Sequence, residues 1–387
     1  MADGPAPLSL SLHRRIAEIP AAEWDSCAGG DNPFVSHAFL STLEDSGSAV
    51  PDRGWLPQHA VLRDEAGTVL ACAPCYAKSH SQGEYVFDHS WADALERAGG
   101  HYYPKLQVCV PFSPVPGPRL LVRPFANVPP GALAQALVQG CQAVGASSAH
   151  VTFCTAEEWT ALGEASWLQR LGTQFHWTNR GYGSFDDFLG ALASRKRKVL
   201  KRERREVQAS GLTLRCLRGA EITGRHWDAF HRFYRSTTDR KWGRSAYLTR
   251  RFWPMLGERL GDAVVLMMAE RDGEPVAGAL NLLGRDAIYG RNWGATVEVP
   301  FLHFELCYYM AMDFAIAHGI SRVEAGAQGE HKIQRGYLPV PTYSAHWIAH
   351  RGLSDAVREF LGRERPAMLR EIEMLATLSP FRREGEA

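Results

Sequence analysis

Long apolar runs are absent from this chain of 387 residues, since no stretch of about 18 uncharged apolar residues occurs in it. We therefore predict no transmembrane helix. The first residues, MADGPAPLSLSLHRRIAEIP, do not combine a basic start with an apolar stretch, so we also expect no signal peptide. Together these features predict a cytoplasmic protein.

An excess of charge of one sign is also missing. The sequence has 43 Lys and Arg against 42 Asp and Glu, which gives a formal net charge of +1. Such a balance predicts no global attraction to nucleic acid or to membranes, so any attraction must come from a local patch. Internal repeats and low-complexity tracts are absent. A chain of this length predicts two domains, because one hydrophobic core rarely serves so many residues.

Cysteine is sparse, with eight residues scattered along the chain. Only Cys72 and Cys75 form a C-x-x-C pair, and no second pair of this kind is present to complete a zinc site. The surrounding sequence, LACAPCYAKSH, is apolar and typical of a strand. We interpret the pair as buried free thiols, with a redox or metal role as the alternative, and we predict no metal site.

The N-terminal half mixes strands and helices. The segment PQHAVLRDEAGTVLACAPCYAKSH predicts a hairpin, because two apolar runs flank the turn sequence DEAG. A helix is expected from about Gly131 to Val144 and a buried strand from His150 to Phe153. A short helix near Glu157–Leu171 and a strand at QFHWTN follow.

A basic segment then marks a change of character. Ser184 is a candidate N-cap and Gly211 a candidate stop, with 26 residues and no proline between them. This spacing predicts one long helix. Its second half carries eight basic residues between Arg195 and Arg205.

The C-terminal half alternates more regularly. Three strand-like runs, AVVLMMAERDG, EPVAGALNLLG and RDAIYGRNWGA, predict an antiparallel meander. An apolar helix ending at Gly319, a short strand SRVEAGA, a helical piece GEHKIQRGY and a strand TYSAHWIAHR are expected next. The last element is an amphipathic helix, or two helices joined at Pro366.

This order of elements resembles the acyltransferase domain of the GNAT superfamily. Nearly the whole chain more closely resembles the FemAB-like predicted N-acyltransferases of bacteria, a peptidoglycan-biosynthesis or recognition family. Nine segments carry the resemblance in order: NPFVSHAFLSTLEDSGS, GEYVFDHSWADA, YYPKLQVCVPFSPVPGPRLL, SSAHVTF, QFHWTNRGYGSFDDFL, SRKRKVLKRERREV, YGRNWG, FLHFELCYY and EAGAQGEHKIQRGYLP.

The resemblance implies an α/β (α+β) fold of two tandem GNAT-like domains, as in FemABX-type transferases, with a long basic helix at the domain junction. We expect an acceptor-side domain over residues 1–175 and an acyltransferase domain over 176–348, with residues 349–387 forming a helix that packs back on the body. The implied activity is acyl or aminoacyl transfer to an amine, with cell-envelope precursors as candidate acceptors.

The resemblance also places the chemistry. GNAT-like domains open a cleft where two parallel strands separate, here AIYGRNWGA and RVEAGA. Glu324 is the first candidate for the general base, followed by Glu330 and His331, and Asn292 with backbone amides would polarise the carbonyl. The alternatives are that Glu324 pairs structurally with Arg322 or Arg335 and that His331 is a capping or surface residue.

Lys332 and Arg335 lie three residues apart on the short helical piece, close enough to bind one anion, and Gln328 could add a donor. A phosphate loop is excluded because the G-x-x-x-x-G-K-[ST] spacing is missing. The segment WGATVEVPFLHFE also lacks the glycine pattern with which GNAT acetyltransferases bind coenzyme A, and it contains Glu298. The resemblance therefore favours aminoacyl-tRNA over acyl-CoA as the donor, with no tightly bound cofactor.

The basic second half of this helix starts with four cations, Arg195, Lys196, Arg197 and Lys198, ahead of its first acid, Glu203. Such density predicts contact with an anionic donor such as tRNA. The alternative is a solvated helix in which ion pairs three and four residues apart balance the charges.

Candidate acceptor-binding residues come from both halves. In the N-terminal half, Asp88, Tyr103 and Lys105 lie among aromatic residues and are expected to face a groove between the domains, with a place in the core as the alternative. In the C-terminal half the candidates are Trp293, His303 and Glu305. His303 and Glu305 must face different ways on their helix, so we expect one in the cleft and one in a structural bond.

Two rival functions remain open at this point. One is an acetyl-CoA-dependent GNAT N-acetyltransferase of a small amine. The other is a non-catalytic GNAT-like module that binds an anionic precursor or RNA.

Overall fold

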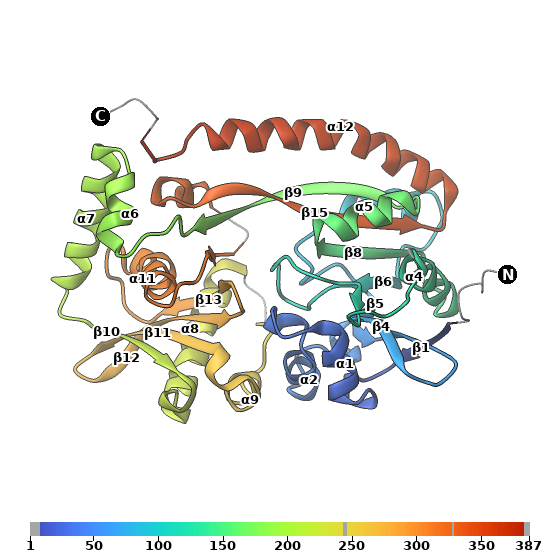
Figure 1. Cartoon of the computed structure of the whole chain (residues 1–387), viewed down its shortest axis with the longest axis horizontal. Helices are drawn as coiled ribbons and strands as arrows, with labels where there is room; N and C mark the ends of the chain where they lie inside the picture. Colours follow the sequence, from blue (N-terminus) through green and yellow to red (C-terminus); the bar gives the residue numbers. More distant parts are fainter. Residues whose placement is uncertain (1–7, 130, 243–245, 327–328, 383–387) are drawn as a thin grey trace. The chain divides into compact units, whose positions relative to one another are not determined.

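The computed structural model describes residues 8–129, 131–242, 246–326 and 329–382 (Figure 1). The chain forms two compact units, residues 1–172 with 341–370 and residues 173–340 with 371–387. It passes from one unit to the other within β9 (Leu168–Thr178), β15 (Leu338–Ile348) and α12 (Arg351–Ala376). Residues 341–348, which we expected in the second domain, belong to the first unit because β15 pairs there with β8.

The first unit contains two sheets. The smaller is antiparallel and has the order β1 (Ser9–His13), β3 (His59–Arg63), β4 (Val69–Ala73) and β7 (Leu121–Val122). The larger continues from the second half of β15 through β8 (Ser148–Cys154), β6 (Lys105–Val108), β5 (Cys75–Lys78) and β2 (Trp55–Pro57). The described α-helices are α1 (Ala21–Ala28), α2 (His37–Asp45), α3 (His89–Arg97), α4 (Ala132–Ala143) and α5 (Ala156–Glu164).

The predicted elements of this unit are largely confirmed. β3 and β4 form the expected antiparallel hairpin around residues 64–68. α4 and β8 occupy the expected positions, and α4 packs its buried leucines and Cys141 against the sheet. The helix expected to reach Leu171 ends earlier, at Glu164, because Leu168 already begins β9.

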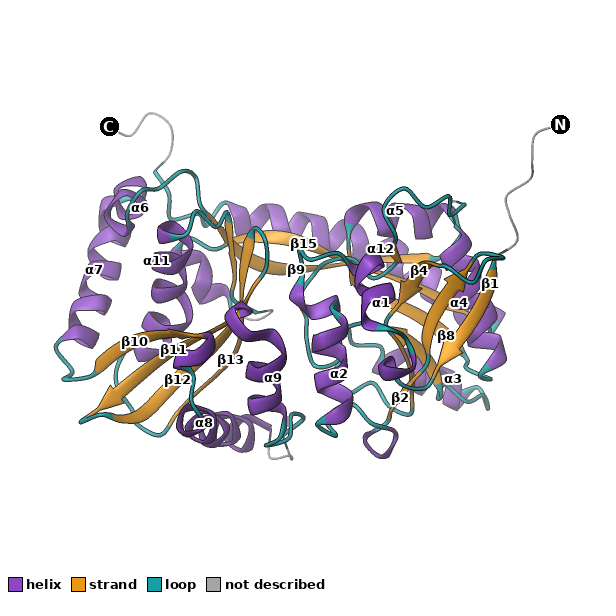
Figure 2. Ribbon diagram, turned by 60° about the horizontal axis from the view of Figure 1, so that its bottom comes forward, coloured by secondary structure: helices purple, strands orange, loops and turns teal. Residues whose placement is uncertain are grey.

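The second unit is built on one sheet of order β10 (Thr213–Arg218), β11 (Val264–Arg271), β12 (Glu274–Leu283), β13 (Ala287–Ala295), β14 (Arg322–Glu324) and the end of β9. Its α-helices are α6 (Phe185–Ala191), α7 (Ser194–Gln208), α8 (Gly224–Trp242), α9 (Phe252–Leu260), α10 (Leu302–Phe304) and α11 (Met310–Ala317). α11 and α8 lie on opposite faces of the strands β11 to β13 (Figure 2).

The central strands follow the predicted order. β11, β12 and β13 form an antiparallel meander, and β14 pairs parallel to β13 after a crossover through α11. The crossover helix packs Ala311 and Met312 against Ile288 and Val323 in one buried cluster. Apolar burial of this helix therefore fixes β14 beside β13.

The single long helix predicted from Ser184 to Gly211 is wrong. Ser184 does cap a helix, through its Oγ, which accepts from the Asp187 N–H at 3.1 Å, but α6 ends at Ala191. Leu192 is extended and buried, and it pairs with Phe381 in a β-bridge. The Ala193 N–H donates to the Pro380 carbonyl at 2.9 Å. The C-terminal segment therefore takes over the backbone bonds that would have continued the helix.

Two other helices differ in detail from their patterns. The apolar helix before Gly319 contains a π-helical turn, Glu305–Tyr309, between α10 and α11. The last helix, α12, continues through Pro366 as one element instead of breaking there. Proline removes one backbone donor from a helix but does not always end it.

The close approach of β13 to α8 gives a stability prediction. A Cβ added at Gly294 would overlap the Phe233 carbonyl group of α8. We expect Gly294→Ala to lower the free energy of unfolding by roughly 1–3 kcal/mol, since backbone must move. Gly362→Ala is the matched control, because a Cβ there meets nothing within 4 Å. Urea denaturation should show that the control is stabilised by about 0.5–1 kcal/mol.

Candidate active site

The site begins where β13 and β14 part. Their parallel pairing covers only Ala287–Tyr289 and Arg322–Glu324, while β13 continues to Ala295. On its other side β13 carries a β-bulge, because two of its residues, 291 and 292, oppose the single residue Leu280 of β12. The bulge turns β13 at the position where it loses its parallel partner.

A cavity of about 80 Å³ occupies the space between the separated strands. β12 and β13 form one wall, and residues of α10 and the π-helical turn form another. The lining residues are Ala279, Leu280, Asn281, Gly290, Arg291, Asn292, Trp293, His303, Cys307, Tyr308 and Ala325. Three of the predicted site residues, Asn292, Trp293 and His303, therefore meet at one cavity. The rings of Trp293 and His303 are in edge contact, with centroids 5.1 Å apart.

Glu324 lies beside this cavity and does not line it. Its neighbour Val323 packs with α11, so strand alternation puts the Glu324 side chain on the opposite face of the sheet. Its Oε1 accepts from Arg322 Nε at 2.9 Å, as the structural alternative expected. Its Oε2 is buried without a hydrogen bond, and His176 Nε2 is 3.7 Å away.

The environment of Glu324 brings its titration to neutral pH. Burial raises the pKa of Glu324 to about 7, although the adjacent Arg322 acts to lower it. A carboxylate with this pKa can both accept and return a proton at physiological pH. Arg335, the other partner considered for Glu324, bonds elsewhere.

Two residues that the sequence pattern did not reveal flank Glu324. Tyr289 of β13 and His176 of β9 are its register partners on the two sides. Burial, with Arg322 and Lys332 nearby, lowers the pKa of His176 to about 3, so this imidazole is neutral. Burial and the Glu324 charge raise the pKa of Tyr289. Only the strand register brings these residues together, and no local motif encodes it.

On the short helix Glu330–Arg335, the two cations predicted to bind one anion, Lys332 and Arg335, have different partners. Lys332 is buried and donates to the Gly326 carbonyl at 2.7 Å, and burial lowers its pKa to about 8. Arg335 donates to Glu203 Oε1 at 2.8 Å and stacks 3.4 Å above the Phe304 ring. The two cations thus have different partners. Gln328 lies outside the described residues.

The other residues of this helix are more accessible. Glu330 and His331 are both exposed. His331 Nε2 lies 3.0 Å from the hydroxyl of Tyr308, which lines the cavity. His331 therefore reaches the cavity rim through Tyr308, whereas no contact of Glu330 connects it to the site among the described residues.

Comparison with known proteins identifies the family of this chain. A family model described as peptidoglycan biosynthesis/recognition, FemAB-like, matches residues 15–383. The chain belongs to the FemAB-like family. No curated protein matches the sequence.

Solved structures agree with this fold. The crystal structure of FemX is 12% identical, with a TM-score of 0.54 over 90% of this chain and all (100%) of that one. The C-terminal domain of a putative lysylphosphatidylglycerol synthetase from Agrobacterium fabrum is 11% identical, with a TM-score of 0.54 over 88% and 95%. L-PGS from Bacillus licheniformis is 12% identical, with a TM-score of 0.50 over 86% and 98%. The predicted FemABX-like α/β fold is therefore confirmed.

In this FemAB-like protein α7 is fixed to the site by buried ion pairs. Arg204 donates to Glu305 at 2.8 Å and also pairs with Asp313 of α11. Glu203 accepts from Arg335 and from the Tyr309 hydroxyl. Burial raises the pKa of Glu305, while Arg204 acts to lower it. Of the two candidates on this helix, Glu305 therefore makes the structural bond and His303 lines the cavity.

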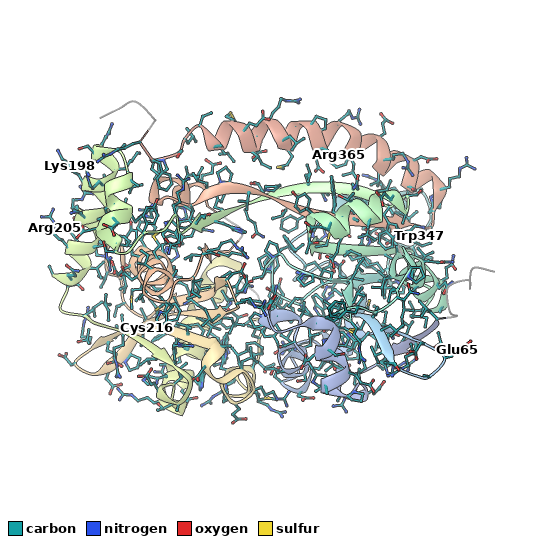
Figure 3. The ribbon with its side chains drawn as sticks, viewed as in Figure 1. Glu65, Lys198, Arg205, Cys216, Trp347 and Arg365 are labelled. Atoms are coloured by element: carbon teal, nitrogen blue, oxygen red, sulfur yellow. The ribbon has the colours of Figure 1, made fainter. Side chains whose placement is uncertain are left out.

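The opposite face of α7 is open. Ser194, Arg195, Lys198, Val199 and Arg202 line a shallow groove. Lys196 instead bonds Gln334, and Arg197 is partly buried. Figure 3 shows Lys198 and Arg205 on α7, and both side chains are exposed.

The predicted acceptor residues of the first unit form a buried network centred on Lys105. Lys105, which is 1% exposed, donates to Glu84 at 2.7 Å, to Ser81 at 2.8 Å and to Asp88. Although burial acts to raise it, the pKa of Asp88 is held well below its usual range by Lys105. Asp88 and Lys105 are therefore buried partners of each other, as the alternative of a place in the core expected. Tyr103 is partly exposed and bonds Ser81 at 2.8 Å.

The first unit also has a parallel strand pair, and a side chain fills the space beyond it. β6 and β8 pair up to Val108 and Val151, and Arg119 Nε then donates to the Thr152 carbonyl at 3.1 Å. Arg119 is fully buried and also donates to the carbonyl groups of Val115, Gly117 and Pro118. The equivalent space in the second unit is the cavity.

Two kinds of feature are absent from the described ranges. No group of three or more His, Cys, Asp or Glu side chains there is placed to hold a metal ion. No helix in the same ranges is long and apolar enough to cross a membrane.

Replacing only one partner of the Arg204–Glu305 pair should lower the free energy of unfolding strongly. Arg204→Met leaves the Glu305 carboxylate, 2% exposed, without its partner. We expect a loss of roughly 2–4 kcal/mol in the free energy of unfolding, partly recovered by adding Glu305→Gln. Arg202→Met removes an exposed pair with Glu206 on the same helix and should cost less than about 0.5 kcal/mol. Equal losses for both arginine variants would contradict this account.

Proposed function

We propose that this FemAB-like protein is an N-acyltransferase whose second unit carries the chemistry. The observation that supports it most is the position of Glu324. Its buried, unbonded Oε2 and its pKa of about 7 occur at the residue where the parallel strands part, next to the cavity. A base at neutral pH beside a cavity is the minimum that acyl transfer to an amine requires.

The proposed reaction balances as follows. The amine loses one proton to the Glu324 carboxylate and attacks the carbonyl carbon of the donor, forming the amide bond. The bond from that carbon to the donor's oxygen or sulfur breaks, and the proton returns to this leaving group. Asn292 and neighbouring backbone amides, which lie on the cavity wall, would polarise the carbonyl.

The amine would approach Glu324 while the acyl group occupies the cavity. Trp293 and His303 give the cavity an aromatic wall suited to an acyl or aminoacyl chain. His331, through Tyr308, is a second candidate for proton transfer at the rim. The family description makes an amine of a peptidoglycan precursor the first acceptor to test.

For the donor we propose an aminoacyl-tRNA. The open face of α7 presents Arg195 and Lys198, which have no acidic partner in the described part of the chain and suit a phosphate backbone. Acyl-CoA is the second candidate, since a GNAT-like cleft is compatible with either donor. Incubation with labelled acetyl-CoA or with charged tRNA, each with a panel of amines, separates them. Turnover with acetyl-CoA alone would remove the tRNA proposal.

Substitution of the proposed base is the direct test. Glu324→Gln keeps the side-chain shape and removes the proton acceptor, so kcat should fall about 10²–10⁴-fold. Glu330→Gln, in the exposed part of the same segment, should retain most of the activity. Steady-state kinetics with the productive donor measure both variants. Unchanged turnover in Glu324→Gln would eliminate this residue as the base.

The pKa of Glu324 predicts opposite pH trends for activity and stability. The value of kcat/KM should rise through about pH 7 as the carboxylate forms. Between about pH 4.3, where an exposed glutamate titrates, and pH 7, the folded state binds more protons at this residue than the unfolded state. Its contribution to stability is therefore fully present below this window and is lost as pH rises through it. Denaturation at several pH values should show this loss in wild type and not in Glu324→Gln.

A further inference from the structure

The wall of the cavity contains a thiol. Cys307 lies in the π-helical turn, is partly exposed and belongs to the lining. Of the other seven cysteines, six are buried and Cys216 is exposed on β10, outside the cavity lining. Turns of this kind occur frequently at functional sites. Cys307 is therefore the thiol that a molecule in the cavity can reach.

An imidazole lies on the same wall as this thiol. His303 and Cys307 are four residues apart on one helical stretch, a spacing that puts both side chains on the same face, and both line the cavity. The His303 ring is in edge contact with the rings of Trp293 and Tyr308, at centroid distances of 5.1 and 5.3 Å. These contacts hold the imidazole at the wall. A cysteine activated by a neighbouring histidine is a recurrent arrangement in nucleophilic catalysis.

A buried cation favours the thiolate form of Cys307. The Lys332 ammonium is 2% exposed, donates to the Gly326 carbonyl at 2.7 Å and has no ion pair with a carboxylate in the described part of the chain. Burial lowers the pKa of Lys332, and Cys307 is the charge that acts to raise it. The interaction is mutual, so the lysine charge in turn stabilises a thiolate at Cys307.

A second buried group indicates that the cavity takes up a molecule. Asn281 also lines the cavity and is 0% exposed. Its Nδ2 donates to the carbonyl oxygens of Ala279 at 3.2 Å and Val265 at 3.4 Å, whereas its Oδ1 is buried and unbonded. Buried acceptors are rarely left without a water or a ligand. Asn281 and Cys307 thus line one space that has room for either.

We propose that Cys307 is a catalytic nucleophile that takes the acyl group as a thioester, and that His303 is the base that removes the thiol proton. The reactivity of the thiol rests on the cavity geometry, whereas transfer of the acyl group to an amine rests on the proposed function. The acyl group would then be attached to the cavity wall, next to Glu324, before the amine attacks.

The two steps balance in atoms and charge. In the first, the thiol proton passes to His303 and the Cys307 sulfur bonds to the carbonyl carbon of the donor. The bond from that carbon to the donor's oxygen or sulfur breaks, and the proton goes to this leaving group. In the second, the amine attacks the thioester and gives one proton to Glu324, and the Cys307 sulfur leaves and recovers that proton. Such a sequence predicts ping-pong kinetics and an acyl-enzyme that accumulates without an amine.

The test uses a small thioester, S-acetyl-N-acetylcysteamine, as the acyl donor. The full chain with Cys216→Ser is incubated with this probe without an amine, and peptide mass spectrometry measures acetylation of Cys307. The rate should be at least about 10-fold higher than that of free N-acetylcysteine at the same pH, because imidazole and ammonium favour the thiolate. Adding Cys307→Ser should remove the acetylated peptide.

Histidine variants test the role of the base. His303→Gln should lower the acetylation rate of Cys307 about 10-fold or more, and imidazole in solution should restore part of the rate to His303→Ala. A merely structural histidine would not be rescued in this way. His318→Gln is the control, because His318 is an exposed residue that stacks on Phe314 outside the cavity lining. Should the His303 variants fail to fold, the rate of Cys307 in the Cys216→Ser protein decides alone.

The outcomes separate this inference from the proposed function. Acetylation of Cys307 no faster than that of the free thiol, or equally fast in His303→Gln, would overturn the nucleophile. Amine acylation by Cys307→Ser at the wild-type kcat would keep the proposed function and also overturn the thioester. Rapid acetylation of Cys307 that no amine reverses would support the nucleophile and remove the transfer to an amine.

Discussion

The separation of β13 and β14 after three residue pairs is the constraint on which the rest of the site depends. Strands in a parallel pair satisfy each other's backbone groups, so an early separation needs another source of order. Here the bulge against β12 turns β13, and the crossover helix holds β14 by apolar burial of Val323. Because both strands are fixed on their outer sides, the space between them remains open as a cavity and does not collapse.

The cavity wall formed by the π-helical turn is held in place by ion pairs and hydrogen bonds, whereas the strands are held by apolar burial. The π-helical turn Glu305–Tyr309 directs Cys307 and Tyr308 to the cavity and Glu305 and Tyr309 to α7. Extra residues in a helix are locally unfavourable and persist where tertiary contacts compensate. Arg204 and Glu203 on α7 supply those contacts. The same basic helix that presents cations to solvent therefore also stabilises the cavity wall with its buried face.

Sequence patterns predicted what is local and missed what depends on register. The meander and the apolar crossover helix follow from alternation and spacing over a few residues, whereas the resemblance to GNAT-like domains implied the place of Asn292 and Trp293 at the strand opening. His176 and Tyr289 reach Glu324 only through pairing between strands far apart in the sequence. The break at Leu192 likewise depends on Phe381, nearly two hundred residues later in the chain. Helix propensity correctly predicted helical residues on both sides of the break. At Leu192 itself, the tertiary contact with Phe381 overrode that propensity.

The two units differ at the end of their parallel strand pair, and this difference is the reason for placing the proposed chemistry in the second unit. Each contains a parallel strand pair with space beyond its last residue pair. In the first unit Arg119 is buried at that position and gives four of its five N–H groups to backbone carbonyls, so this charge is bound within the structure. In the second unit Gly290 leaves the corresponding space empty, and Asn281 faces it with an unused acceptor. A space filled by a bonded side chain stabilises a fold, whereas an open cavity with an unbonded acceptor has room for a water or a ligand. We therefore place the proposed chemistry in the second unit and interpret the buried Lys105–Asp88 pair of the first as structural.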